Sequence, residues 1–100
     1  MDMQRLMRQA QKMQNDMNRA QAKLKEMVVE GQASGGMVKV TATGAGEITA
    51  IEIDPEIVDP EDVEMLQDMI LVAINDANAK VAELNNAEMS KVTGGMKLPF

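Results

Sequence analysis

The first 27 residues carry an unbroken heptad of apolar side chains, and this constrains the fold more than any other feature of the chain. Successive apolar residues are separated alternately by three and four positions, so all of them lie along one side of an α-helix. They are Met3, Leu6, Ala10, Met13, Met17, Ala20, Leu24 and Met27. We therefore predict a helix over residues 1–27 whose apolar seam packs against a partner helix or against the chain's own core.

Positive charge gathers on another side of the same predicted helix. Arg5, Arg8, Lys12 and Arg19 are separated by three, four and seven residues, which returns each of them to one helical face. We expect no acidic residue to share this basic stripe. Neighbouring Gln and Asn side chains add neutral groups that can reach phosphates or base edges. A charged helix face is often only a solvated face, so the stripe alone leaves solubility open as its role.

The charge is distributed unevenly along the chain. The formal net charge is −6, which does not suit a uniformly basic nucleic-acid binder. Residues 1–25, however, hold six of the ten Lys and Arg residues and only two of the 16 acidic residues, a balance of +4, so the remainder carries −10. An anionic partner would be attracted to the first helix and repelled elsewhere, which would orient it.

Three short strands are predicted after the first helix, at residues 28–33, 37–43 and 48–54. Glycine-containing turns at 34–36 and 44–46 separate them, since glycine accepts positive φ at little steric cost. The result is an antiparallel meander over 28–54. Alternation places two sets of residues each on one face of the sheet: Val38, Val40 and Ala42, and Thr49, Ile51 and Ile53.

A second long helix is predicted over residues 60–93, with a short tail at 94–100. Asp59 is expected to cap it and Pro60 to occupy its first position. A broad apolar stripe follows from Leu66 to Leu84, and the Asn85–Asn86 pair is a candidate break or kink. The sequence thus predicts one α+β domain over 1–100, of order α-β-β-β-α, in which two helices flank a three-stranded antiparallel sheet.

Composition predicts a thin core and excludes several kinds of chemistry. With 11 Met and one aromatic residue, a chain of 100 residues packs adaptably but buries little, which favours oligomerisation. The absence of His and Cys removes the usual nucleophiles, bases and soft metal ligands. We expect no catalytic site, cofactor, metal ion or small-molecule substrate, and the acidic stretch from Asp54 to Asp68 fits a solvated helix start. No apolar run is long enough for a membrane span, so we expect a cytoplasmic protein.

Five segments in order resemble the YbaB/EbfC family of bacterial nucleoid-associated, DNA-binding proteins. These are 6–14 (LMRQAQKMQ), 35–41 (GGMVKVT), 51–55 (IEIDP), 74–77 (INDA) and 93–100 (TGGMKLPF). The resemblance implies a tweezer-like homodimer that binds and condenses DNA in the nucleoid, with effects on transcription and links to recombinational repair. It also implies DNA contact by the terminal helical regions. Carried over to this chain, the DNA-binding residues are Arg5, Arg8, Lys12, Arg19, Lys23, Lys91 and Lys97.

Two functional hypotheses follow. In the first, a non-enzymatic homodimer binds double-stranded DNA through phosphate contacts from the basic faces of its first helices. The scarcity of aromatic residues disfavours single-strand binding by base stacking. In the second, the chain is a protein–protein interaction module whose Met-rich seam holds a partner helix and whose charges serve solubility. An enzyme acting through carboxylates is a third class, disfavoured because no acid–base pair can be named.

Overall fold

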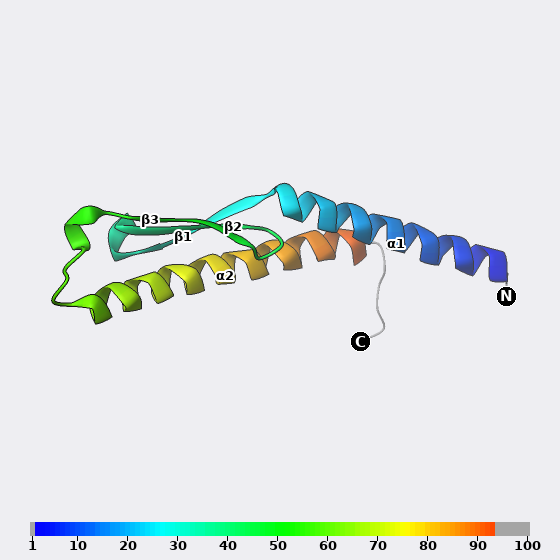
Figure 1. The fold of residues 1–100 in the computed structure, drawn as a ribbon. Helices are drawn as coiled ribbons and strands as arrows, with labels where there is room; N and C mark the ends of the chain where they lie inside the picture. Colours follow the sequence, from blue (N-terminus) through cyan, green and yellow to red (C-terminus); the bar gives the residue numbers. More distant parts are fainter. Residues whose placement is uncertain (1, 94–100) are drawn as a thin grey trace, which may run out of the picture.

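Two long helices and a three-stranded antiparallel sheet make up the protein (Figure 1). The computed structural model describes residues 2–93 and extends over 70 × 27 × 17 Å. The element order is α1 (Met3–Glu26), β1 (Val28–Ala33), β2 (Val38–Thr43), β3 (Ile48–Ile53) and α2 (Val63–Thr93), with 3-10 turns at Ser34–Gly36 and Pro55–Ile57. The predicted α-β-β-β-α order and antiparallel meander are therefore confirmed.

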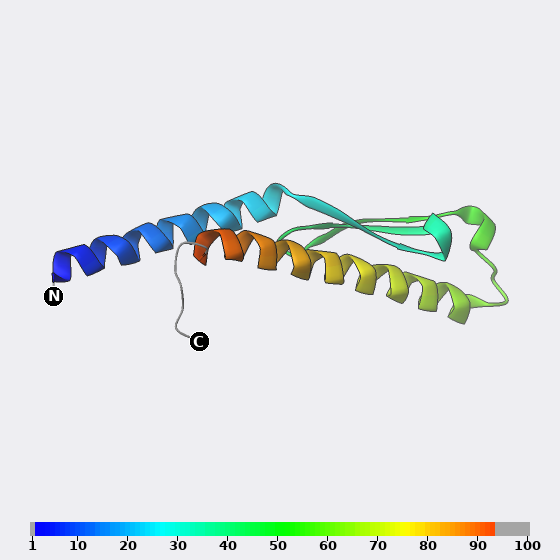
Figure 2. The ribbon, with the colours of Figure 1, turned by 180° about the vertical axis from the view of Figure 1, so that it is seen from behind.

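The sheet has the order β1-β2-β3, and α2 runs along one of its faces (Figures 1 and 2). Val40 on β2 lies opposite Gly31 on β1 and Ile51 on β3, so these three residues face the same side. Val38, Val40 and Ala42 are fully buried against α2, as their alternation predicts. The core is made almost entirely of small side chains: Ala33, Val38, Val40, Ala42, Ala73 and Ala77.

The helix α2 lies mainly over β1 and β2, and this leaves much of β3 exposed. Ile48 and Ile51 are 39% and 47% exposed, although their neighbours on β2 are buried. The register shifts between Thr41 and Ala42, so Ala42 pairs with Ile48 and Thr49 has no partner in the register. The predicted face of Thr49, Ile51 and Ile53 is therefore wrong at its first member, since this bulge places Ile48 there instead.

The outer edge of β1 is occupied by side chains from α2. The backbone N–H of Gln32 donates to Asp76 Oδ2 at 2.9 Å, and Lys80 Nζ donates to the carbonyl oxygen of Glu30 at 2.6 Å. Both backbone groups point away from β2. Without the side chains of α2, they would be free to pair with another strand on that outer side. The edge of β1 is thus covered at two positions by the helix that packs on its face.

The start of α2 differs from the prediction by three residues. Asp59 accepts from the N–H of Glu61 and its carbonyl accepts from the N–H of Asp62, which closes a turn before the helix. Asp62 is the capping residue, because its Oδ1 accepts from the N–H of Met65 at 3.2 Å. The predicted cap at Asp59 and first position at Pro60 are therefore wrong.

The Asn85–Asn86 pair does not interrupt α2, which continues to Thr93. Asn85 Nδ2 donates to the carbonyl oxygens of Gly44 and Val81, at 2.7 and 2.9 Å. The side chain thus ties α2 to the β2–β3 turn, and the helix continues through this position without a break.

Candidate nucleic-acid interface

The helix α1 is anchored at its C-terminal half and projects from the body at its N-terminal half (Figures 1 and 2). Ala20 and Leu24 are buried, whereas Met3 and Leu6 of the same apolar seam are 70% and 45% exposed. The N–H of Gly44 donates to the carbonyl of Met27 at 2.9 Å, which ties the end of the helix to the β2–β3 turn. The seam thus packs on the chain's own α2 over part of its length only.

The projecting half carries three basic residues with no carboxylate partner. Arg5, Arg8 and Lys12 are exposed and line a shallow hollow together with Asp2 and Gln9. In the part of the chain that the structure describes, these three cations make no ion pair within 4 Å. Asp2 is engaged as the helix cap, since its Oδ1 accepts from the N–H of Gln4 at 3.1 Å. Three cations therefore face solvent over about 10 Å of helix.

An acidic residue does share the basic stripe, contrary to expectation. Asp16 follows Lys12 by four positions and precedes Arg19 by three, and its Oδ1 lies 3.9 Å from Arg19 Nη1. Asp16 also lines a hollow with Arg8, Lys12 and Arg19. The prediction failed because the three- and four-residue steps that place Lys12 and Arg19 on one face place Asp16 there too.

Two further predicted residues are already paired with one carboxylate. Lys23 Nζ on α1 and Lys91 Nζ on α2 lie 3.3 and 3.1 Å from Glu88 Oε1. The hydrogen bond from Lys91, joined by that from Lys23, holds the pKa of Glu88 below its ordinary value, while burial acts in the opposite direction. Sequence reasoning missed Glu88. Its spacing of four residues from Leu84 continues the apolar stripe of α2 and could have indicated its burial.

The seven predicted DNA-binding residues thus fall into four groups. Arg5, Arg8 and Lys12 are free of carboxylates in the described chain, Arg19 is loosely paired, Lys23 and Lys91 are tied to Glu88, and Lys97 lies outside the described residues. The structure brings the first four to one side of α1 and places Lys91 beside the root of that helix, near Lys23.

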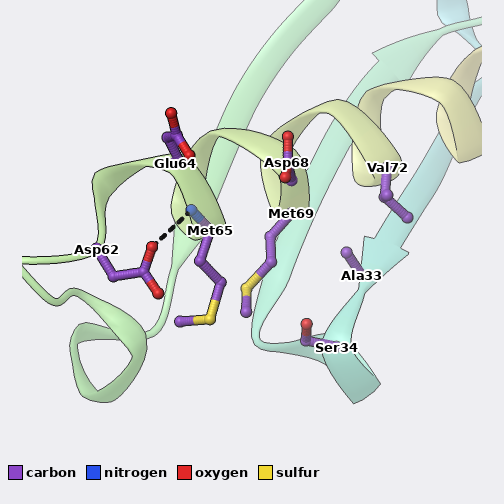
Figure 3. Close-up of a pocket in the computed structure, with 8 residues that line it drawn as sticks. All are labelled: Ala33, Ser34, Asp62, Glu64, Met65, Asp68, Met69 and Val72. Carbon is purple, nitrogen blue, oxygen red and sulfur yellow. Dashed lines mark hydrogen bonds between the residues drawn. The ribbon is translucent and has the colours of Figure 1, made fainter.

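The opposite end of the molecule is acidic. Figure 3 shows a pocket at the start of α2 in which Met65 and Met69 lie beside Ala33 and Ser34 of the β1 end. Asp62, Glu64 and Asp68 also border it, and Figure 3 shows the carboxylates of Glu64 and Asp68 pointing away from the methionines. A surface of this charge repels a polyanion, whereas the exposed cations of α1 lie at the other end of the molecule.

Metal-binding and membrane-spanning features are both absent from residues 2–93. No group of three or more acidic residues there is arranged to hold a metal ion. Neither described helix has a stretch apolar enough, over sufficient length, to cross a membrane.

Comparisons with known proteins agree on one family. The sequence model of the YbaB/EbfC DNA-binding family matches residues 1–96. A nucleoid-associated protein of Acetivibrio thermocellus is 58% identical over 91 residues, which cover 91% of this chain and 80% of that protein. One of Alkaliphilus metalliredigens is 52% identical over 98 residues, covering 98% and 86%. The crystal structure of an uncharacterized protein from Helicobacter pylori superposes with a TM-score of 0.77 at 28% identity, covering 91% and 95% of the two chains.

Proposed function

The chain belongs to the YbaB/EbfC DNA-binding family, and on this premise we propose that it binds double-stranded DNA as a homodimer through the basic face of α1. The observation that carries the proposal is the set of three exposed, unpaired cations on the projecting half of that helix, Arg5, Arg8 and Lys12. When such cations contact DNA phosphates, they release the counterions condensed on the DNA. This release favours binding whatever the base sequence of the DNA.

The acidic body supports a directed mode of binding. Residues 1–25 carry a net charge of +4, and the rest of the chain carries a net charge of −10. DNA therefore approaches the projecting helix and is kept away from the acidic end of α2. An α-helix is also narrow enough for the major groove of B-DNA, about 12 Å wide, so the exposed Gln side chains beside the cations can approach base edges.

Uncovered apolar surface supports the homodimer. Ile48 and Ile51 on β3 are exposed although they lie opposite buried residues of β2, and Met3 and Leu6 are exposed at the projecting end of the apolar seam of α1. A second copy that covers these residues would bury area that a core of Ala and Val does not supply. Two copies would also double the number of phosphate contacts.

The cellular role proposed for the protein follows from this mode of binding. The two bacterial relatives are named nucleoid-associated proteins, and we place this protein in the nucleoid of the cytoplasm. It would organise DNA there by binding it, without catalysis. It would influence gene expression and repair by changing the access of other proteins to the bound DNA.

The test is the salt dependence of binding to a fluorescently labelled duplex of about 30 bp, measured by anisotropy. The wild type should bind at low salt, with log K falling linearly against log salt. Arg8→Ala/Lys12→Ala should bind more weakly, and its slope should be shallower by about 0.9 for each phosphate that is no longer neutralised. Alanine is a good helix former, so circular dichroism should show an intact α1.

The matched control is Lys25→Ala/Lys39→Ala, which removes the same charge from positions off the projecting half of α1. We expect its slope to stay close to that of the wild type. Equal losses in the two double variants would mean that net charge alone governs binding. No binding by the wild type at low salt would refute the proposal.

A second candidate is supported by the exposed start of the seam at Met3 and Leu6. In this alternative the seam holds a helix from another protein and the basic stripe only provides solubility. It predicts that Leu6→Lys abolishes association while the Arg8→Ala/Lys12→Ala variant retains it, and that no duplex is bound at low salt.

A further inference from the structure

Glu88 is the one buried charged side chain in the part of the chain that the structure describes, with 5% of its surface exposed. Its Oε1 lies between two ammonium groups, 3.3 Å from Lys23 Nζ on α1 and 3.1 Å from Lys91 Nζ on α2. One carboxylate therefore holds two cations that come from different helices, at the point where α1 leaves the body.

The two lysines are open to solvent while the carboxylate is not. The side chains of Lys23 and Lys91 are 54% and 66% exposed, against 6% for that of Glu88. Arg19 and Asp16 line the same hollow. An anion that entered this hollow from solvent would meet the ammonium groups of the two lysines first. Each ammonium group, however, already has the carboxylate oxygen of Glu88 as a partner on its buried side.

A lysine that left Glu88 for a phosphate would leave the carboxylate short of a partner. Burying a charge without its full set of partners is costly, because water cannot replace the lost interaction. The buried carboxylate therefore competes with any external anion for both lysines. Its lowered pKa agrees with this, because the group stays ionised at neutral pH.

We propose that Glu88 withholds Lys23 and Lys91 from DNA phosphates, so that contact is confined to the projecting half of α1. The inference rests on the proposed DNA-binding function and deepens it, because it assigns a residue that limits the number of phosphates neutralised. Glu88 is a positioning residue in this account, since it touches the two lysines and not the DNA.

The test is Glu88→Gln, measured by the same salt series on the labelled duplex. Glutamine keeps the size of the side chain and an oxygen that can accept from the lysines, but it removes the negative charge. Without the negative charge both lysines are held less strongly and become available to phosphates, so the slope of log K against log salt should steepen by up to about 1.8 for each chain. A residue that only pins the two helices together would not change the number of phosphates bound.

The matched control is Glu83→Gln, which removes one negative charge from an exposed position on α2. It should raise the affinity slightly through the net charge while leaving the slope unchanged. A double variant, Lys23→Ala/Lys91→Ala, completes the design. It should leave the slope of the wild type unchanged, and it should cancel the gain when combined with Glu88→Gln.

Several results would overturn the inference. One is a slope for Glu88→Gln that matches the slope for Glu83→Gln. Another is weaker binding by Glu88→Gln with an unchanged circular dichroism spectrum, which would make Glu88 a support for α1 and nothing more. If Glu88→Gln fails to fold, the variant Lys23→Ala/Lys91→Ala decides. A slope shallower than that of the wild type would overturn the inference, because it would mean that the two lysines contact phosphates in the wild type. Absence of wild-type binding would refute the proposed function itself, and this inference with it.

Discussion

Gly31 on β1 faces the carbonyl oxygen of Ala73 on α2 so closely that no side chain fits between them, and the backbone N–H of Ala77 closes the same space. A methyl group at position 31 would collide with helix backbone, which cannot move aside as a flexible side chain could. We expect Gly31→Ala to push α2 off the sheet and lower the free energy of unfolding by about 3 kcal/mol or more. Urea unfolding followed by circular dichroism measures this.

Gly35→Ala separates the collision from the ordinary cost of replacing glycine. Gly35 has φ +66°, but a methyl group added there would meet nothing within 4 Å, so only backbone strain of about 1 kcal/mol is expected. Equal losses of stability in the two variants would contradict a close approach between α2 and β1.

Asp16 interrupts the basic stripe of α1, and its removal should strengthen DNA binding. Asp16→Asn deletes the carboxylate beside Arg19 while keeping the shape of the side chain. A charge about 4 Å away in water contributes about 1 kcal/mol, so affinity at low salt should rise by up to about fivefold. Anisotropy titration compares it with Glu26→Gln, which removes an exposed carboxylate from the last turn of the same helix. A larger gain for Glu26→Gln would locate the DNA elsewhere.

Acid should destabilise the fold through Asp76. The hydrogen bond from the N–H of Gln32, with help from Lys80, holds the pKa of Asp76 below its ordinary value of 3.8. A carboxylate with a lowered pKa in the folded state contributes stability that is fully present above the ordinary pKa. That stability is lost as the pH falls through the folded value. Thermal melts should therefore show an acid limb below about pH 4.

Asp76→Asn should flatten that limb. It should melt below the wild type at neutral pH, and the difference should shrink on acidification because the wild type loses the same interaction. Asp68→Asn, at an exposed position on α2, serves as the control and should follow the wild-type profile. A constant gap between Asp76→Asn and the wild type at all pH values would argue against this linkage.

In the proposed homodimer, the uncovered face of β3 is the surface that we expect the second copy to cover. Ile51 lies opposite buried Val40 and yet is 47% exposed. Ile51→Lys should shift the protein from dimer to monomer in sedimentation equilibrium, because a charge placed on an apolar contact must be desolvated. Val58→Lys, at a 50% exposed position in the segment before α2, should leave the mass unchanged. A dimeric Ile51→Lys variant would exclude this face.

The periodicity of the sequence was sufficient for the order and faces of most elements. The heptad seam and the Val38-Val40-Ala42 alternation predicted their elements correctly because each is a local property of one helix or strand. The Thr49 face failed because a bulge depends on pairing with a neighbouring strand, which alternation does not encode. The cap of α2 failed because Asp59 and Asp62 are both good caps, and only the turn between them decides which is used.

The basic face of α1 was predicted in outline but not in its pairing. Spacing placed Arg5, Arg8 and Lys12 together, since they belong to one helix. It could not show that Lys23 and Lys91 converge on one carboxylate, because they are 68 positions apart and meet only when α1 packs on α2. The state of a surface cation depends on tertiary contacts that a single helix does not contain.

The two borders of the sheet differ in a way that limits growth. On β1, Asp76 and Lys80 occupy backbone groups that a further strand would need, whereas β3 carries Ile48 and Ile51 in the open. A sheet that can be extended at only one border accepts a single neighbouring sheet. When two such sheets pair, each covers the open border of the other. A pair of sheets joined through β3 would therefore present only its two β1 borders to a further strand, and side chains of α2 occupy backbone groups on both.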